Sequence, residues 1–123
     1  MVTPENITYL DPEEIFIFGS NRRGEHAGGA ARLAHEKFGA EWGISEGLTG
    51  QCYAFCTLEP EMTKVGQRML EKQRNRLFST CRALPEKVFL LTKVGCGIAG
   101  FAEKEMIALF KDSPSNLVKP EGW

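Results

Sequence analysis

The stretch Thr92–Phe101, "TKVGCGIAGF", carries glycines at positions 95, 97 and 100 between an apolar run and a predicted helix. Glycine lets the backbone approach a ligand closely and turn its N–H groups outward. A helix that begins just after such a loop adds partial positive charge, which favours anions. The spacing G-x-G-x-x-G therefore predicts a phosphate-binding loop, with a purely structural turn as the alternative.

The same spacing also occurs in the dinucleotide-binding fingerprint, but the rest of that pattern is missing. The fingerprint needs an acidic residue about 20 positions later and further strands beyond it. Glu121 lies near that distance, yet the sequence ends at Trp123. We therefore favour a phosphate cradle of another kind.

Strands and helices are predicted to alternate along the whole chain. Short apolar runs predict buried strands at residues 15–18, 52–57, 87–93 and 116–119. Helical spacing of apolar residues predicts helices at residues 28–39, 63–84 and 102–112. Thr63 is expected to cap the second helix and Pro85 to end it. Residues 47–51 are expected to form a loop.

The inward faces of these helices are expected to carry small or apolar residues at helical spacing. They are Ala27, Ala31, Ala34 and Phe38; Val65, Met69, Leu77, Cys81 and Leu84; and Ala102, Met106, Leu109 and Phe110. Alternating strands and helices predict an α/β domain with a mostly parallel sheet and helices on both faces. In such folds ligands bind beyond the carboxyl ends of the strands.

Composition bounds the class of protein. The chain has 123 residues, of which 42% are hydrophobic and 25% charged, with a net charge of −1. These totals predict one globular domain spanning residues 1–123. No apolar run approaches the length of a membrane span and no signal peptide is recognisable, so we expect a cytoplasmic protein without membrane contacts.

The cysteines and histidines do not have the spacing of a metal site. We expect no metal and no cofactor, and we expect the four thiols to be reduced and buried. They are Cys52, Cys56, Cys81 and Cys96.

A second loop follows the first predicted strand, in the segment "GSNRRGEHAGGAARLA" that begins at Gly19. It opens directly into a helix, so the free N–H groups at the helix start predict a second anion site. Two such loops at neighbouring strand ends suit a ligand with two phosphates. Arg22 and Arg23 either add positive charge there or are ordinary surface residues. His26 is either an acid–base group or an exposed loop residue without a task.

The predicted helix 63–84 is basic, with Lys64, Arg68, Lys72, Arg74, Arg76 and Arg82. A nucleic-acid-binding face is one interpretation of this composition. We favour a solvated helix surface and expect no nucleic-acid partner, because the charges are spread around the helix and the net charge is near zero.

Taken together, the two loops resemble those of the macrodomain superfamily. The likeness runs from Gly19-Ser20-Asn21 with Ala27–Ala31 to the second glycine loop, Val94–Phe101, and covers about residues 14–120. Two groups are similar: small phage and bacterial proteins with an F-x-F-G-S-N motif, and macrodomains that release glutamate-linked ADP-ribose. The resemblance implies a three-layer macrodomain-like fold, shortened at its N-terminus, that binds ADP-ribose or a related product of NAD.

The resemblance also implies which residues contact the ligand. Asn21 would contact the distal ribose, Phe101 would lie against that ribose, and the two loops would hold the diphosphate. With the strand-end residues, the expected ligand-binding set is Gly19, Ser20, Asn21, Ala27, Gly28, Gly29, Ala30, Ala31, Thr57, Gly95, Cys96, Gly97, Ile98, Ala99, Gly100 and Phe101.

The chain departs from the family pattern at several positions. The aspartate that recognises adenine in the family has no counterpart in the short segment before the first strand. Leu58 and Ala99 stand where the glutamate-releasing enzymes have a lysine and an aspartate. "HAGG" replaces the commoner "HGAG".

Two functions follow as alternatives, and a nucleic-acid-binding module is a third. One is a hydrolase of phosphatase or esterase type that acts at the distal ribose of an ADP-ribose derivative. Asn21 would then orient a water molecule and His26 would transfer the proton. The other is a non-catalytic protein, of phage type, that sequesters a nucleotide signal. The sequence gives no oligomeric state.

Overall fold

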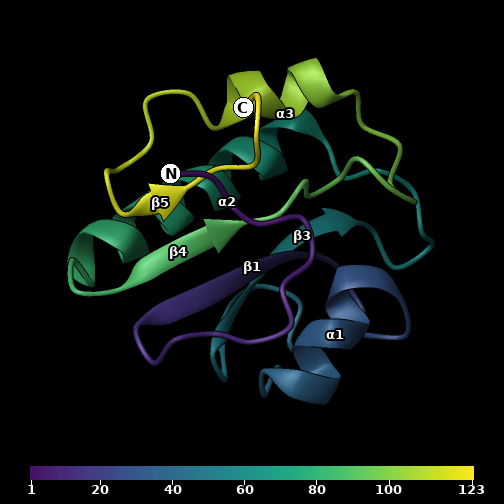
Figure 1. The fold of residues 1–123 in the computed structure, drawn as a ribbon. Helices are drawn as coiled ribbons and strands as arrows, with labels where there is room; N and C mark the ends of the chain where they lie inside the picture. Colours follow the sequence, from purple (N-terminus) through teal and green to yellow (C-terminus); the bar gives the residue numbers. More distant parts are fainter.

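The computed structural model describes all 123 residues as a central sheet between helices. Figure 1 shows the sheet crossing the middle of the molecule, with α1 below it and α2 and α3 above it. The α/β class expected from the sequence is confirmed. In chain order the elements are β1 (Glu14–Asn21), α1 (Gly29–Lys37), β2 (Gly47–Thr49), β3 (Cys52–Leu58), α2 (Gln67–Ala83), β4 (Val88–Leu91), α3 (Glu103–Leu109) and β5 (Leu117–Val118).

The sheet has the strand order β2-β3-β1-β4-β5. β1 pairs in parallel with β3 and with β4, and β4 pairs in parallel with β5. The expectation that residues 47–51 form only a loop is wrong, because β2 adds an antiparallel edge strand beside β3. Since β1, β3 and β4 are parallel, their carboxyl ends lie at the same edge of the sheet.

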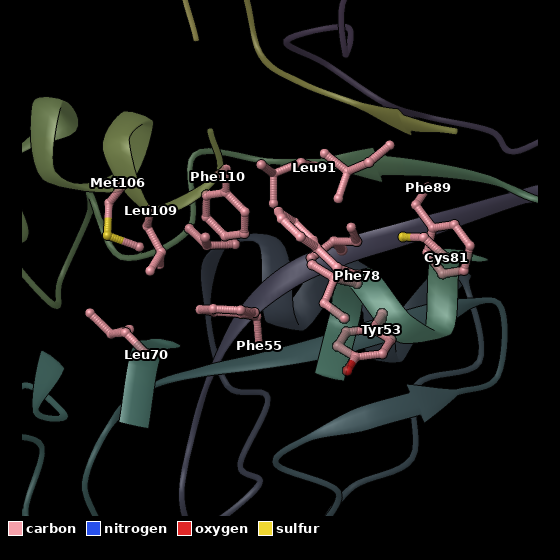
Figure 2. Close-up of a cluster of buried hydrophobic side chains, with 14 of the residues drawn as sticks. Tyr53, Phe55, Leu70, Phe78, Cys81, Phe89, Leu91, Met106, Leu109 and Phe110 are labelled. Carbon is pink, nitrogen blue, oxygen red and sulfur yellow. The ribbon is translucent and has the colours of Figure 1, made fainter. Parts of the chain in front are cut away.

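Each face of the sheet has its own apolar core. On one side, residues of β1, β3 and β4 such as Phe55 and Leu91 pack against α2 and α3. Figure 2 shows these strand side chains pointing toward Leu70 and Phe78 of α2 and toward Met106, Leu109 and Phe110. On the other side, residues that include Phe16 and Phe18 pack against α1. Helices on both faces explain why the strands are apolar throughout rather than alternating.

The helix boundaries and faces are partly corrected. α2 begins at Gln67 after an N-cap at Gly66, and Thr63 does not cap it, because the Thr63 hydroxyl donates instead to Glu61. Ala27 and Ala102, expected on inward faces, are exposed. The buried face of α2 includes Leu70, Gln73 and Phe78, which the apolar pattern did not identify, besides Leu77 and Cys81, which it did.

Three of the four thiols are buried, as expected, and all four are free. Cys96 is only half-buried. Burial raises the pKa of Cys52 and of Cys81 to about 12. These thiols are therefore protonated core residues at neutral pH. None of the helices is both long and apolar enough to cross a membrane.

Candidate functional site

A cleft of about 490 Å³ lies where β1, β3 and β4 end. Its volume falls within the range of roughly 300–1,000 Å³ that is usual for small-molecule sites. It is lined by Gly19, Ser20, Asn21, Glu25, Ala27, Gly28, Gly29, Ala30, Ala31, Thr57, Met62, Thr92, Lys93, Val94, Gly95, Gly97, Ile98 and Ala99. The structure thus brings both predicted glycine loops and Thr57 to one cleft.

One wall of the cleft is the start of α1. Gly28 is the N-cap residue, with an extended backbone and no side chain that caps the helix. No hydrogen bond within the chain uses the N–H groups of Gly29, Ala30 or Ala31. The first N–H groups of a helix have no intrahelical acceptor, so here they are free to bind an anion.

The opposite wall is the loop from Lys93 to Phe101, which is built from two tight turns. The Cys96 N–H donates to the Lys93 carbonyl at 3.3 Å, and the Gly100 N–H donates to the Gly97 carbonyl at 3.0 Å. These turns leave the N–H groups of Gly97, Ile98 and Ala99 without an acceptor in the chain. Successive unpaired N–H groups in such turns form a concave anion-binding surface.

Glycine is required at position 95 but not at 97. Gly95 has a φ of +78°, and a β-carbon there would lie 2.9 Å from Cδ2 of Phe101. At Gly97 a β-carbon would meet no atom within 4 Å. Gly95 therefore shapes the loop, whereas the bare backbone of Gly97 leaves space in the cleft.

Ionisable side chains on the cleft are few. Lys93 and Glu25 line it, and Lys93 also forms an exposed ion pair with Glu103 at 3.4 Å. The two arginines of the first loop do not line the cleft. Arg22 pairs with Glu59 at 3.3 Å, and Arg23 lies 3.9 Å from Glu25. Lys93 is thus the one cationic side chain in the lining of the cleft.

Asn21 lines the cleft, but its amide is engaged by the backbone of its own loop. Its Nδ2 donates to the Glu25 carbonyl at 3.0 Å, and its Oδ1 accepts from the Glu25 N–H at 3.2 Å. These bonds close the loop from β1 toward α1. In this structure Asn21 positions the loop, with one N–H left over to meet a ligand.

His26 is not on the cleft. The expectation of a solvent-facing His26 is wrong, because its side chain is 1% exposed and packs among the rings of Phe18, His35 and Trp42. Its Nε2 lies 2.9 Å from the Glu41 carbonyl, and its Nδ1 has no partner. An imidazole enclosed in this way cannot transfer a proton to a ligand in the cleft.

Three other predicted contacts also lie outside the cleft lining: Cys96, Gly100 and Phe101. Phe101 packs against the core beneath α2 and α3, and the ammonium of Lys64 lies 5.0 Å from its ring centre. Phe101 therefore supports the loop from behind, next to Gly95, instead of facing the ligand.

The cleft also contains residues that the sequence did not indicate: Glu25, Met62, Thr92, Lys93 and Val94. Met62 adopts a left-handed backbone with a φ of +68°, which is rare outside glycine. Its side chain is 47% exposed, and Ile98 on the glycine loop is 90% exposed. These two exposed apolar side chains, beside the unpaired N–H groups of the same cleft, suit a ligand that has an apolar face as well as charge.

The basic residues of α2 are partly occupied by other contacts. Arg74 donates to the Leu109 carbonyl at 2.9 Å, and Arg76 pairs with Glu46. Arg82 lies over the ring of Phe78. These three arginines thus have contacts within the chain.

No group of three or more His, Cys, Asp or Glu side chains lies close enough together to hold a metal ion. No protein-family model, curated protein or solved structure matches this chain.

Proposed function

We propose that this chain binds ADP-ribose or a related nucleotide diphosphate in the cleft between α1 and the loop Lys93–Phe101. The observation that carries the proposal is the two sets of N–H groups without acceptors, at Gly29–Ala31 and at Gly97–Ala99, which line the same cleft. N–H groups at a helix start and in consecutive turns are the backbone features that bind phosphate.

Two sets of donors on two walls favour a diphosphate over a single phosphate. Each phosphate of such a ligand can accept hydrogen bonds from one wall, and Lys93 supplies a positive charge at the rim. Met62 and Ile98 offer apolar contact to a ribose. The resemblance of the two loops to those of the macrodomains supports the same class of ligand.

Between hydrolysis and binding alone, the geometry favours binding. The catalytic alternative relies on His26 for proton transfer, and that imidazole is enclosed by aromatic rings away from the cleft. Asn21, which would orient the water molecule, has both amide atoms bonded to Glu25. We therefore propose a binding protein that retains its nucleotide rather than cleaving it.

Thermal unfolding tests the ligand class. We expect ADP-ribose to raise the melting temperature much more than adenosine does, because adenosine lacks the phosphates that the two walls would hold. A ligand at a hundredfold excess over its Kd stabilises the folded state by about 2.7 kcal/mol. The shifts are measured by differential scanning calorimetry at equal ligand concentrations.

Calorimetric titration with ADP-ribose, AMP and NAD provides the control on affinity. ADP-ribose should bind more tightly than AMP, which has one phosphate. Equal shifts from adenosine and ADP-ribose, or no heat of binding with any of the three, would contradict the proposal.

A further inference from the structure

A second cavity, of about 500 Å³, lies beside the cleft. Residues from both ends of the chain line it together with the end of β4, and Thr92 and Lys93 line both the cavity and the cleft. Figure 1 shows the purple N-terminal segment passing beside the carboxyl end of β4. We call this space the terminal cavity. The terminal cavity and the cleft therefore share a wall at Thr92 and Lys93.

Hydrogen bonds between the two ends of the chain hold the wall of the terminal cavity in place. Thr3 forms a parallel bridge to Pro120, and its N–H donates to the Lys119 carbonyl at 2.9 Å. The Thr3 hydroxyl donates to the Val118 carbonyl at 3.0 Å, and the residue is 7% exposed. These bonds fix the first residues against β5, so the cavity is formed before a ligand arrives.

The lining combines apolar surface with carboxylates. Val2, Pro4, Leu91 and Pro120 give apolar surface, and the exposed side chains of Glu5 and Glu121 line the cavity together with Thr3, Thr92 and Lys93. An ionised carboxylate only accepts hydrogen bonds. The cavity thus suits a group that has apolar faces and carries N–H donors at its edge.

We infer that the terminal cavity holds the adenine of the nucleotide whose phosphates lie in the cleft. The apolar faces would pack on the ring, and the carboxylate of Glu5 or Glu121 would accept a hydrogen bond from the exocyclic amino group. This inference rests on the proposed function. The adenine site would be built from the two chain ends. It would take the place of the aspartate that recognises adenine in the macrodomains.

The test compares three ligands that differ stepwise: inorganic pyrophosphate, the 5′-diphosphate of purine riboside, and ADP. Purine riboside has hydrogen where adenosine has its amino group. A hydrogen bond to a charged acceptor is worth about a factor of ten or more in affinity. We expect calorimetry to give ADP roughly tenfold tighter binding than the purine riboside diphosphate, and pyrophosphate the weakest binding of the three.

Glu5→Ala combined with Glu121→Ala should abolish the preference for ADP and leave the affinity for pyrophosphate within about twofold. Both side chains are exposed, so the double variant should fold. Glu86→Ala, an exposed carboxylate at the opposite end of β4, is the matched control and should leave the preference unchanged.

The outcomes separate the inference from the proposed function. If pyrophosphate binds but ADP and the purine riboside diphosphate bind equally well, the adenine site is wrong while the phosphate cleft stands. A preference for ADP that survives in the double variant also overturns the adenine site. If none of the three ligands binds, both proposals fail.

Discussion

Gly97→Val should weaken the binding of ADP-ribose by about 100-fold or more and leave the protein folded. A β-carbon at position 97 would meet no atom within 4 Å, so the fold has room for the new side chain. The position lines the cleft beside the unpaired N–H groups of Ile98 and Ala99. A branched side chain there would keep a phosphate from reaching those donors.

The size of the effect follows from the hydrogen bonds lost. A hydrogen bond to a charged group contributes about 1.5–3 kcal/mol, and two such bonds account for at least the roughly 2.7 kcal/mol that corresponds to a hundredfold change in Kd. Affinity is measured by calorimetric titration and folding by circular dichroism melting.

Gly66→Val is the matched control for this experiment. Gly66 also has open space around a β-carbon, but it lies at the start of α2 and does not line the cleft. The Gly66→Val variant should bind ADP-ribose with the same affinity as the wild type. If Gly97→Val binds normally, the glycine loop is only a turn and the phosphate proposal falls.

Much of the fold could be predicted from local sequence. Apolar runs identified β1, β3, β4 and β5, because strands covered by helices on both faces must be apolar throughout. β2 was missed for a physical reason: it is a three-residue edge strand, Gly47–Thr49, with glycines at 47 and 50. Its pairing depends on β3 lying beside it, and no local pattern of three residues carries that information.

Part of the candidate site could also be predicted from the sequence, and part could not. The glycine loops could be predicted, because their phosphate-binding groups belong to the backbone and glycine spacing reveals them. The burial of His26 could not, since it depends on Phe18, His35 and Trp42, which come from three other segments of the chain. The terminal cavity also depends on residues from both chain ends, which only the folded sheet brings together.

Gln73→Leu should destabilise the protein by roughly 2–6 kcal/mol. Gln73 lies on α2 and is 1% exposed, yet it is polar. Its Oε1 accepts from the Cys56 N–H and its Nε2 donates to the Cys56 carbonyl, both at 2.6 Å. The edge strand β2 pairs with β3 only as far as Ala54, so the Gln73 amide takes the place of the missing strand at Cys56.

Leucine has a similar volume and no polar atoms, so the substitution would leave two buried backbone groups without partners. Each such group costs about 1–3 kcal/mol, and the whole stability of a domain is typically about 5–15 kcal/mol. We expect a clear fall in the urea midpoint with an unchanged m-value, which indicates lost stability rather than a different unfolded state.

Gln67→Leu provides the same chemical change on the same helix. The Gln67 side chain is exposed and its amide bonds only to Glu71, at 3.0 Å. Exposed substitutions usually change stability by less than about 0.5 kcal/mol, so its urea midpoint should stay near that of the wild type. If the two variants lose equal stability, the loss comes from leucine on α2 in general and not from the unpaired groups of Cys56. A large loss in Gln73→Leu alone would establish that one side chain completes the sheet where β2 ends, just before β3 reaches the cleft at Thr57.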